Sequence, residues 1–102
     1  MQEANVDKLL GLLGLARRAG KLAMGFTAAE KMVHRGENPL VIMAKDMGPS
    51  QQGKVTRWQP VRGLIEDALT SEDLARTLGR DKLAVVAVSD TGFVKGILKL
   101  DS

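Results

Sequence analysis

The sequence contains no cysteine and no tyrosine, and its aromatic residues are only Phe26, Trp58 and Phe93. Without cysteine there is no disulfide framework, no cysteine nucleophile and no cysteine-ligated metal. The single histidine, His34, could belong to a zinc site only if carboxylates supplied the remaining ligands. So few aromatic side chains argue against a base-stacking platform of the kind that RRM and OB domains offer to single-stranded nucleic acid.

Long apolar runs are also absent. No stretch approaches the roughly 20 consecutive apolar residues that a membrane span requires. The N-terminus, MQEANVDK, is polar and acidic, unlike a signal peptide. The composition, 44% hydrophobic and 26% charged, is typical of a globular protein. We therefore expect one cytoplasmic domain spanning residues 1–102, with no membrane, metal or other cofactor involved.

Basic residues moderately outnumber acidic ones. Fifteen Lys and Arg against twelve Asp and Glu give a formal charge of +3 and an isoelectric point near 9.5. This balance favours polyanionic partners such as nucleic acid without requiring them. Part of the acidic charge is concentrated in one block, which we predict to face away from any nucleic acid. The block comprises Glu66, Asp67, Glu72 and Asp73.

Apolar periodicity and turn residues divide the chain into alternating helices and strands. The apolar runs 39–44 and 83–88 do not alternate with polar residues, which is typical of strands covered on both faces. The pattern predicts an α/β fold: a three-layer α/β/α sandwich with a small mixed four-stranded sheet. Helices are predicted over about 5–19, 27–35, 49–58, 70–78 and from 90 onward, and strands over 21–24, 39–44, 61–65 and 83–88.

Several helix ends have capping signals. Asn5 is predicted to cap the first helix, and Thr70 with Asp73 forms a capping-box pattern before the fourth. Either Ser89 or Asp90 is predicted to cap the last helix.

The first helix also contains Gly11 and Gly14, each of which costs about 1 kcal/mol of helix propensity relative to alanine. Glycines kept inside an apolar helix predict close packing of its backbone against a neighbour.

The stretch from 21 to 36 predicts a strand, a glycine turn and a helix. Residues 21–24 are extended and apolar after Lys21, Gly25 allows the turn, and Thr27 with Glu30 suggests a capping box. A helix start of this kind can receive a phosphate, and Lys31 adds a positive charge one turn along. The alternative is a capped helix that only packs against the core.

An enzyme hypothesis has two possible residues. Asp46 and Asp90 both follow apolar strands, and ligands of open α/β sheets collect at the carboxyl ends of strands. The alternative is that each aspartate caps a helix. No dinucleotide-binding, P-loop or Ser/His/Asp pattern is present. His34 is better explained as a partner of a helix C-terminus than as a base. We therefore predict a protein without catalytic residues.

Several motifs together resemble one family. Residues 12–22, LLGLARRAGKL, followed by Gly25 and Lys31, resemble the bacterial YlxQ-like proteins of the ribosomal protein L7Ae/L30e superfamily. Residues 44–49, AKDMGP, are similar to the family's A-x-D-x-x-P after the second strand, and residues 86–93, VAVSDTGF, are similar to the YlxQ-type ending. The resemblance covers nearly the whole chain.

The resemblance implies an α/β/α sandwich that holds RNA, as in members that bind kink-turn and related RNAs, between the start of the second helix and the loop before the last strand. The family's G-x-N-E-x-x-K falls on Gly25, Thr27, Ala28 and Lys31. Thr27 and Ala28 replace the Asn and Glu that contact sheared G·A pairs in family members. Thr27 retains one hydroxyl and Ala28 has no polar group, so the sequence leaves kink-turn specificity open.

We predict a non-catalytic protein that recognises a structured RNA, kink-turn-like or ribosomal, through backbone and phosphate contacts. One alternative is a protein-interaction module on the same scaffold that has lost specific RNA binding, and the other is a phosphate-handling enzyme built on Asp46 and Asp90. The oligomeric state is not predicted. The RNA-binding candidates are Lys21, Gly25, Thr27, Ala28, Lys31, Arg80 and Lys82, flanked by Arg17, Arg18 and Arg35.

Overall fold

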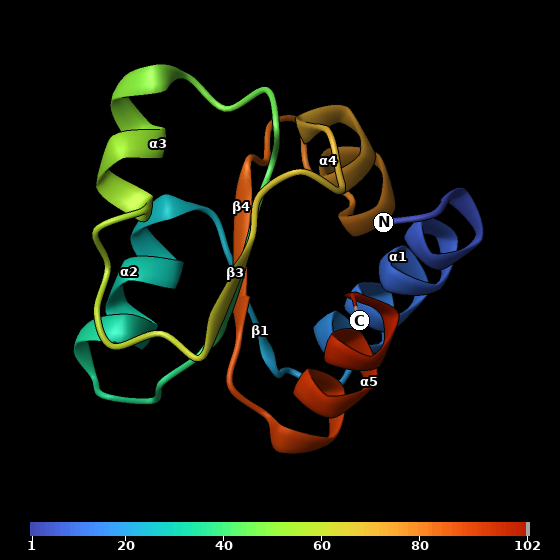
Figure 1. Cartoon of the computed structure of the whole chain (residues 1–102), viewed down its shortest axis with the longest axis horizontal. Helices are drawn as coiled ribbons and strands as arrows, with labels where there is room; N and C mark the ends of the chain where they lie inside the picture. Colours follow the sequence, from blue (N-terminus) through green and yellow to red (C-terminus); the bar gives the residue numbers. More distant parts are fainter. Residues whose placement is uncertain (102) are drawn as a thin grey trace.

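The computed structural model describes residues 1–101, which form five helices and a four-stranded sheet (Figure 1). This confirms the predicted α/β sandwich and its mixed sheet. The helices are α1 (Glu3–Arg18), α2 (Phe26–His34), α3 (Pro49–Val55), α4 (Ser71–Leu78) and α5 (Thr91–Asp101). The strands are β1 (Leu22–Met24), β2 (Leu40–Met43), β3 (Gly63–Ile65) and β4 (Val85–Val88).

The sheet has the strand order β1-β4-β2-β3. β4 pairs antiparallel with both β1 and β2, and β2 pairs parallel with β3. Because β2 and β4 run in opposite directions, the loops that follow them leave from opposite ends of the sheet.

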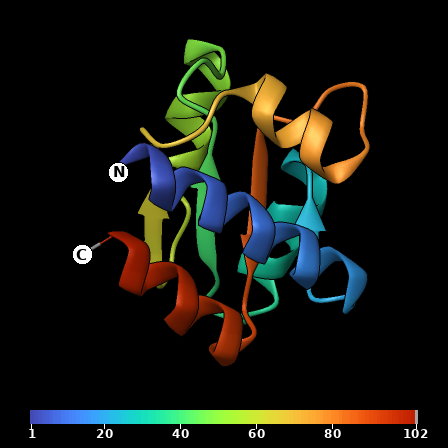
Figure 2. The same ribbon diagram turned by 90° about the vertical axis from the view of Figure 1, so that its right-hand side faces the viewer.

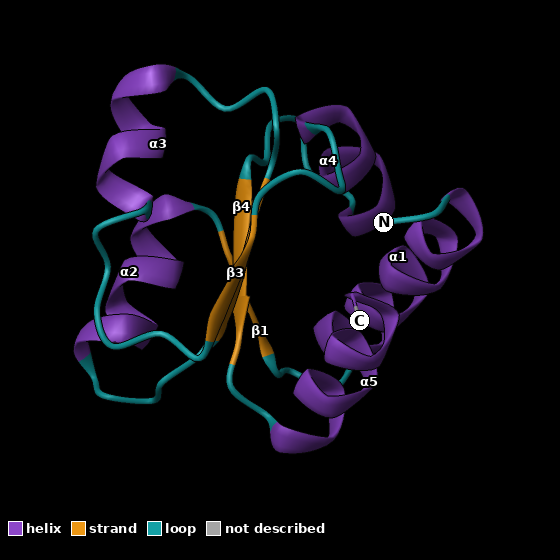
Figure 3. Cartoon of the chain, in the orientation of Figure 1, coloured by secondary structure: helices purple, strands orange, loops and turns teal. Residues whose placement is uncertain are grey.

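The two faces of the sheet are covered by different helices, as Figure 3 shows: α2 and α3 on one side, and α1, α4 and α5 on the other. Leu40 and Ile42 of β2 pack into the cluster under α1, α4 and α5, whereas Val41 and Met43 pack into the cluster under α2 and α3. All residues of β2 and β4 are buried. The expectation of strands covered on both faces is therefore confirmed.

The side chains predicted to cap the last two helices do so. The Thr70 hydroxyl accepts a hydrogen bond from the Asp73 amide, and the Asp73 carboxylate accepts one from the Thr70 amide, both at 3.1 Å. Gly79 closes α4 in the left-handed conformation, at φ +70°. For α5 the cap is Asp90 rather than Ser89, because its Oδ1 accepts the Phe93 amide at 3.1 Å.

The predicted cap of α1 is wrong. The helix begins at Glu3, before Asn5, and the Asn5 amide group donates instead to the Leu100 carbonyl at 3.2 Å. Figure 2 shows α1 running between α4 and α5, and the bond from Asn5 ties α1 to the end of α5.

The longest helix is α1. No helix within residues 1–101, α1 included, has the length and apolarity needed to cross a membrane.

The predicted close packing at the glycines of α1 is also wrong. A Cβ atom added at Gly11 or Gly14 would meet nothing within 4 Å. The close approach between α1 and α5 occurs at Gly96, where a Cβ atom would lie 3.5 Å from the Leu12 side chain.

A second long-range bond joins the loop after β2 to the start of α4. The Asp46 carboxylate accepts hydrogen bonds from the Ser71 amide and the Ser71 hydroxyl, both at 2.7 Å. The hydroxyl, and after it the amide, lower the pKa of Asp46 from its ordinary value of 3.8. The carboxylate therefore stabilises the first turn of α4 in its ionised form.

Replacing Gly11 by alanine should raise the free energy of unfolding by about 0.5–1 kcal/mol, because the helical site is exposed and the added methyl group meets no atom. The matched control is Gly79→Ala, which should lower the free energy of unfolding by roughly 1–2 kcal/mol because alanine is strained at positive φ. Urea denaturation measures the free energy of unfolding of both variants. A destabilising Gly11→Ala would show that the glycine has a packing role.

Asp46→Asn should lower the free energy of unfolding at neutral pH, and the difference from the wild type should shrink in acid. The folded pKa lies below the unfolded one, so the stabilisation is complete above the unfolded value, near 3.8, and is lost as pH falls through the folded pKa. Denaturation between pH 7 and 2 measures this, with the exposed Asp67→Asn as control. A difference that does not change with pH would contradict the role of the charge.

Candidate nucleic-acid interface

The start of α2 is determined by Gly25 and not by a capping box. Gly25 has φ +93° and ψ 165°, a conformation that essentially only glycine adopts, and its amide donates to the Val85 carbonyl at 2.9 Å. This bond ends β1 and lets α2 begin at Phe26. Thr27 therefore lies inside the first turn, where it makes no capping bond, and the predicted pairing of Thr27 with Glu30 is wrong.

The first turn of α2 has backbone amides without helical acceptors. The first intrahelical bond runs from the Ala29 amide to the Gly25 carbonyl at 3.0 Å, so the amides of Phe26, Thr27 and Ala28 precede it. They lie at the positive end of the helix dipole, and the Thr27 residue is exposed. This end of α2 can therefore accept an anionic group.

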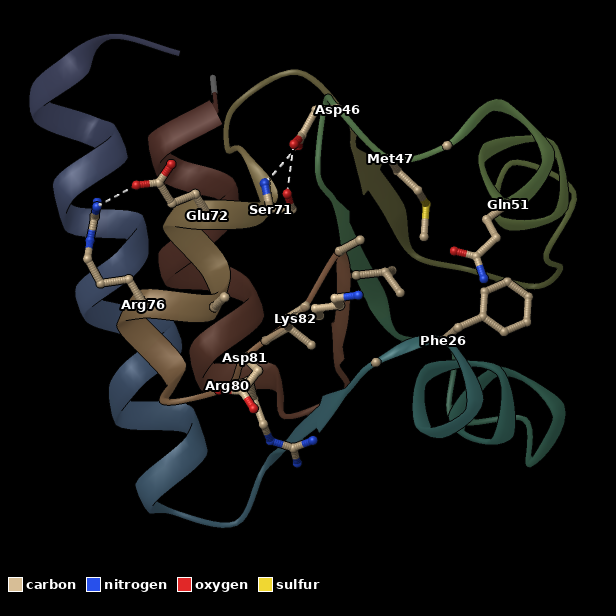
Figure 4. Close-up of a pocket in the computed structure, with 16 residues that line it drawn as sticks. Phe26, Asp46, Met47, Gln51, Ser71, Glu72, Arg76, Arg80, Asp81 and Lys82 are labelled. Carbon is tan, nitrogen blue, oxygen red and sulfur yellow. Dashed lines mark hydrogen bonds and ion pairs between the residues drawn. The ribbon is translucent and has the colours of Figure 1, made fainter.

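A hollow of about 940 Å³ lies between the start of α2 and the loop that joins α4 to β4 (Figure 4). We call it the first hollow. The Phe26 ring forms part of its wall and packs against Trp58, with ring centroids 5.1 Å apart. Phe26 is half-buried. The lining also includes Gly25 and the polar or charged residues Asp46, Ser71, Glu72, Arg76, Arg80, Asp81 and Lys82.

The charges around the first hollow are balanced: three cations and three carboxylates line it. Two of the carboxylates already have partners, since Asp46 binds Ser71 and Glu72 lies 3.5 Å from Arg76. In Figure 4 the Glu72 side chain is directed at Arg76. The prediction that the acidic block faces away from the site is therefore wrong for Glu72, whose charge is nevertheless partnered. Within residues 1–101, neither Arg80 nor Lys82 forms an ion pair.

A second hollow, of about 460 Å³, lies beside the first residues of β1 and the middle and end of α2. Three cations, Lys21, Lys31 and Arg35, and a single carboxylate, Glu37, line it. Glu37 accepts a hydrogen bond from Ser89 Oγ at 2.9 Å and one from Arg35 Nε at 2.8 Å. These bonds, that of Ser89 first, lower the pKa of Glu37 from its ordinary value of 4.5. The second hollow is therefore the more positive of the two.

The candidate residues thus fall into two groups at opposite ends of β1. Gly25, Arg80 and Lys82 line the first hollow, and Lys21, Ala28, Lys31 and Arg35 line the second. Thr27, exposed in the first turn of α2, lines neither. The structure does not bring Lys31 and the Arg80–Lys82 loop into one hollow, as a single continuous patch would require.

The flanking arginines differ in their positions. An Nη atom of Arg17 would lie 3.9 Å from a Cβ atom added at Gly79, which places Arg17 beside the last turn of α4, next to Arg80. Arg18 is exposed at the end of α1 and lines neither hollow.

The two aspartates of the enzyme hypothesis do not meet. Asp46 follows β2 and Asp90 follows β4, and these antiparallel strands end at opposite ends of the sheet. Each carboxylate instead accepts a hydrogen bond at the start of a helix. The two aspartates therefore do not form one site. The capping alternative is confirmed for Asp90, whereas Asp46 does not cap α3, the helix that follows it, but bonds to the first turn of α4. His34 is the last residue of α2, as expected. Between residues 1 and 101, no cluster of three acidic or histidine side chains could hold a metal ion.

Sequence comparison identifies related proteins over most of the chain. The family model of the ribosomal protein L7Ae/L30e/S12e/Gadd45 family matches residues 7–96. The RNA-binding protein YlxQ of Bacillus subtilis is 30% identical over 90 residues, which cover 87% of this chain and 90% of that protein. The large ribosomal subunit protein eL8 of Cenarchaeum symbiosum is 27% identical, over 91% of this chain and 75% of that protein.

Solved structures share the fold. A protein of unknown function from Bacillus halodurans superposes with a TM-score of 0.78 at 31% identity, covering 93% of this chain and 98% of that one. The 15.5 kD RNA-binding protein of Giardia lamblia superposes with a TM-score of 0.74 at 19% identity, covering 98% and 87%. The match of the family model over residues 7–96 shows that this chain belongs to the ribosomal protein L7Ae/L30e/S12e/Gadd45 family.

Proposed function

We propose that this protein binds a structured RNA through backbone and phosphate contacts. One observation carries the proposal: the bond between Gly25 and Val85 holds the amide-bearing start of α2 beside the hollow lined by Arg80 and Lys82. The names of its relatives support it, since YlxQ of B. subtilis is an RNA-binding protein and eL8 of C. symbiosum belongs to the large ribosomal subunit.

Each part of the interface has a chemical role in this proposal. The amides of the first turn of α2 donate to a phosphate or a base edge, and Arg80 and Lys82 neutralise neighbouring phosphates. Lys31 and Lys21 line the second hollow, at the other end of β1, and offer a separate group of positive charges. Because Ala28 has no polar group, the contacts depend on RNA shape and backbone more than on base identity.

Lys82→Ala and Lys31→Ala should each weaken RNA binding across sequences and reduce the slope of log K against log salt by about 0.7–0.9, the contribution of one phosphate contact. The control is Lys95→Ala, an exposed lysine on α5 that lines neither hollow. Filter binding with kink-turn, stem-loop and duplex RNAs at several salt concentrations measures the slopes.

Unchanged slopes in folded variants would reject the roles of the two lysines. Binding to no RNA of the panel at low salt would favour the alternative, a protein-interaction module on the same scaffold. Sequencing the RNA that copurifies after gentle lysis would supply the natural probe.

The double change Thr27→Asn and Ala28→Glu should shift the preference toward the kink-turn RNA, because it places amide and carboxylate groups where family members contact sheared G·A pairs. We expect the wild type to discriminate less between the kink-turn and a stem-loop of equal charge. The ratio of the two dissociation constants measures this. A wild type that already prefers the kink-turn as strongly as the double variant would show that side chains at these positions are not needed.

A further inference from the structure

Two neighbouring side chains and a third that is 52 residues from one of them in the sequence form a hydrogen-bonded series beside the second hollow. Arg35 follows α2, Glu37 lies in the loop before β2, and Ser89 follows β4. Arg35 Nε donates to Glu37 Oε2 at 2.8 Å, and Ser89 Oγ donates to Glu37 Oε1 at 2.9 Å. The Arg35 side chain is 61% exposed and that of Glu37 34% exposed. An exposed arginine is thus linked through a carboxylate to the end of a buried strand.

The series leaves the binding capacity of Arg35 largely intact. Glu37 engages only Nε, so the Nη groups of the guanidinium retain donors for a further acceptor. Both oxygens of Glu37 already accept a hydrogen bond. With Lys21 and Lys31, three cations line a hollow whose single carboxylate accepts a hydrogen bond at each oxygen. The hollow therefore suits an anionic group.

Holding Arg35 in place has a physical benefit. A free, exposed arginine loses considerable rotamer freedom when it binds a ligand, and that loss weakens binding. A side chain that is already oriented by a hydrogen bond loses less on binding.

We propose that the second hollow binds a phosphodiester group of the RNA, and that Glu37 and Ser89 are positioning residues that orient Arg35 toward it. This inference rests on the RNA binding proposed above. According to this inference, Glu37 strengthens RNA binding despite its negative charge.

The sign of one mutational effect separates this proposal from simple electrostatics. If Glu37 acted only through its charge, Glu37→Ala would tighten RNA binding by removing a repulsion. If Glu37 orients Arg35, the same change should weaken binding. We expect a weakening of about two- to fivefold, the scale of an exposed ion pair. In an Arg35→Ala background, Glu37→Ala should no longer weaken binding, because there is no arginine left to orient.

Ser89 provides a charge-neutral version of the test. Ser89→Ala removes the hydroxyl that holds Glu37 and should weaken binding in the wild type but not in the Arg35→Ala background. Ser89→Thr keeps a hydroxyl and should bind RNA as the wild type does. Kink-turn and stem-loop RNAs are the probes, and thermal unfolding verifies that each variant is folded. In the free protein, the Nε–Hε NMR signal of Arg35 should shift in Ser89→Ala and return in Ser89→Thr.

Two results would overturn this inference alone: tighter binding by Glu37→Ala, or Ser89→Ala indistinguishable from the wild type in both binding and the Arg35 signal. If the wild type binds none of the RNAs, the proposed function and this inference fail together. If the wild type binds, and Lys82→Ala weakens that binding while the Glu37 and Ser89 variants do not, only the inference fails.

Discussion

The hydrogen bond from the Gly25 amide to the Val85 carbonyl joins the end of β1 to the start of β4 at the point where α2 begins. At this point Gly25 has positive φ, and the amides of the first turn of α2, like those of any helix start, have no helical acceptors. The same bond brings that turn next to the loop of Arg80 and Lys82, although more than fifty residues separate them in sequence. The candidate interface is thus a consequence of strand pairing between β1 and β4.

Features that depend on neighbouring residues could be predicted from the sequence. The buried strands, the capping box of Thr70 with Asp73, and the helix opened by Pro49 all follow from local patterns, and the structure has each of them. Features that depend on partners far along the chain could not. Thr27 resembles a cap by spacing, but the contact of Gly25 with β4 sets an earlier helix start. Likewise, the Asn5 side chain donates a hydrogen bond to Leu100 of α5 instead of capping α1.

The candidate site shows the same division. The sequence predicts Lys31, Arg80 and Lys82 together as RNA-binding candidates, whereas the structure divides them between two hollows at opposite ends of β1. The sequence assigns no role to Glu37 and indicates Ser89 only as a possible cap, because no local pattern reveals a bond across 52 positions. The antiparallel order of β2 and β4, which separates Asp46 from Asp90, is equally hidden from local patterns.

The central claim is that RNA contacts the start of α2 and the loop before β4 together. The most direct test follows the backbone amide signals of the ¹⁵N-labelled protein by NMR while its copurified RNA is added. The largest shifts should fall on residues 25–28 and 80–82, with little change on the outer faces of α1 and α5. Shifts confined to those outer faces, or shifts at only one of the two segments, would contradict the account.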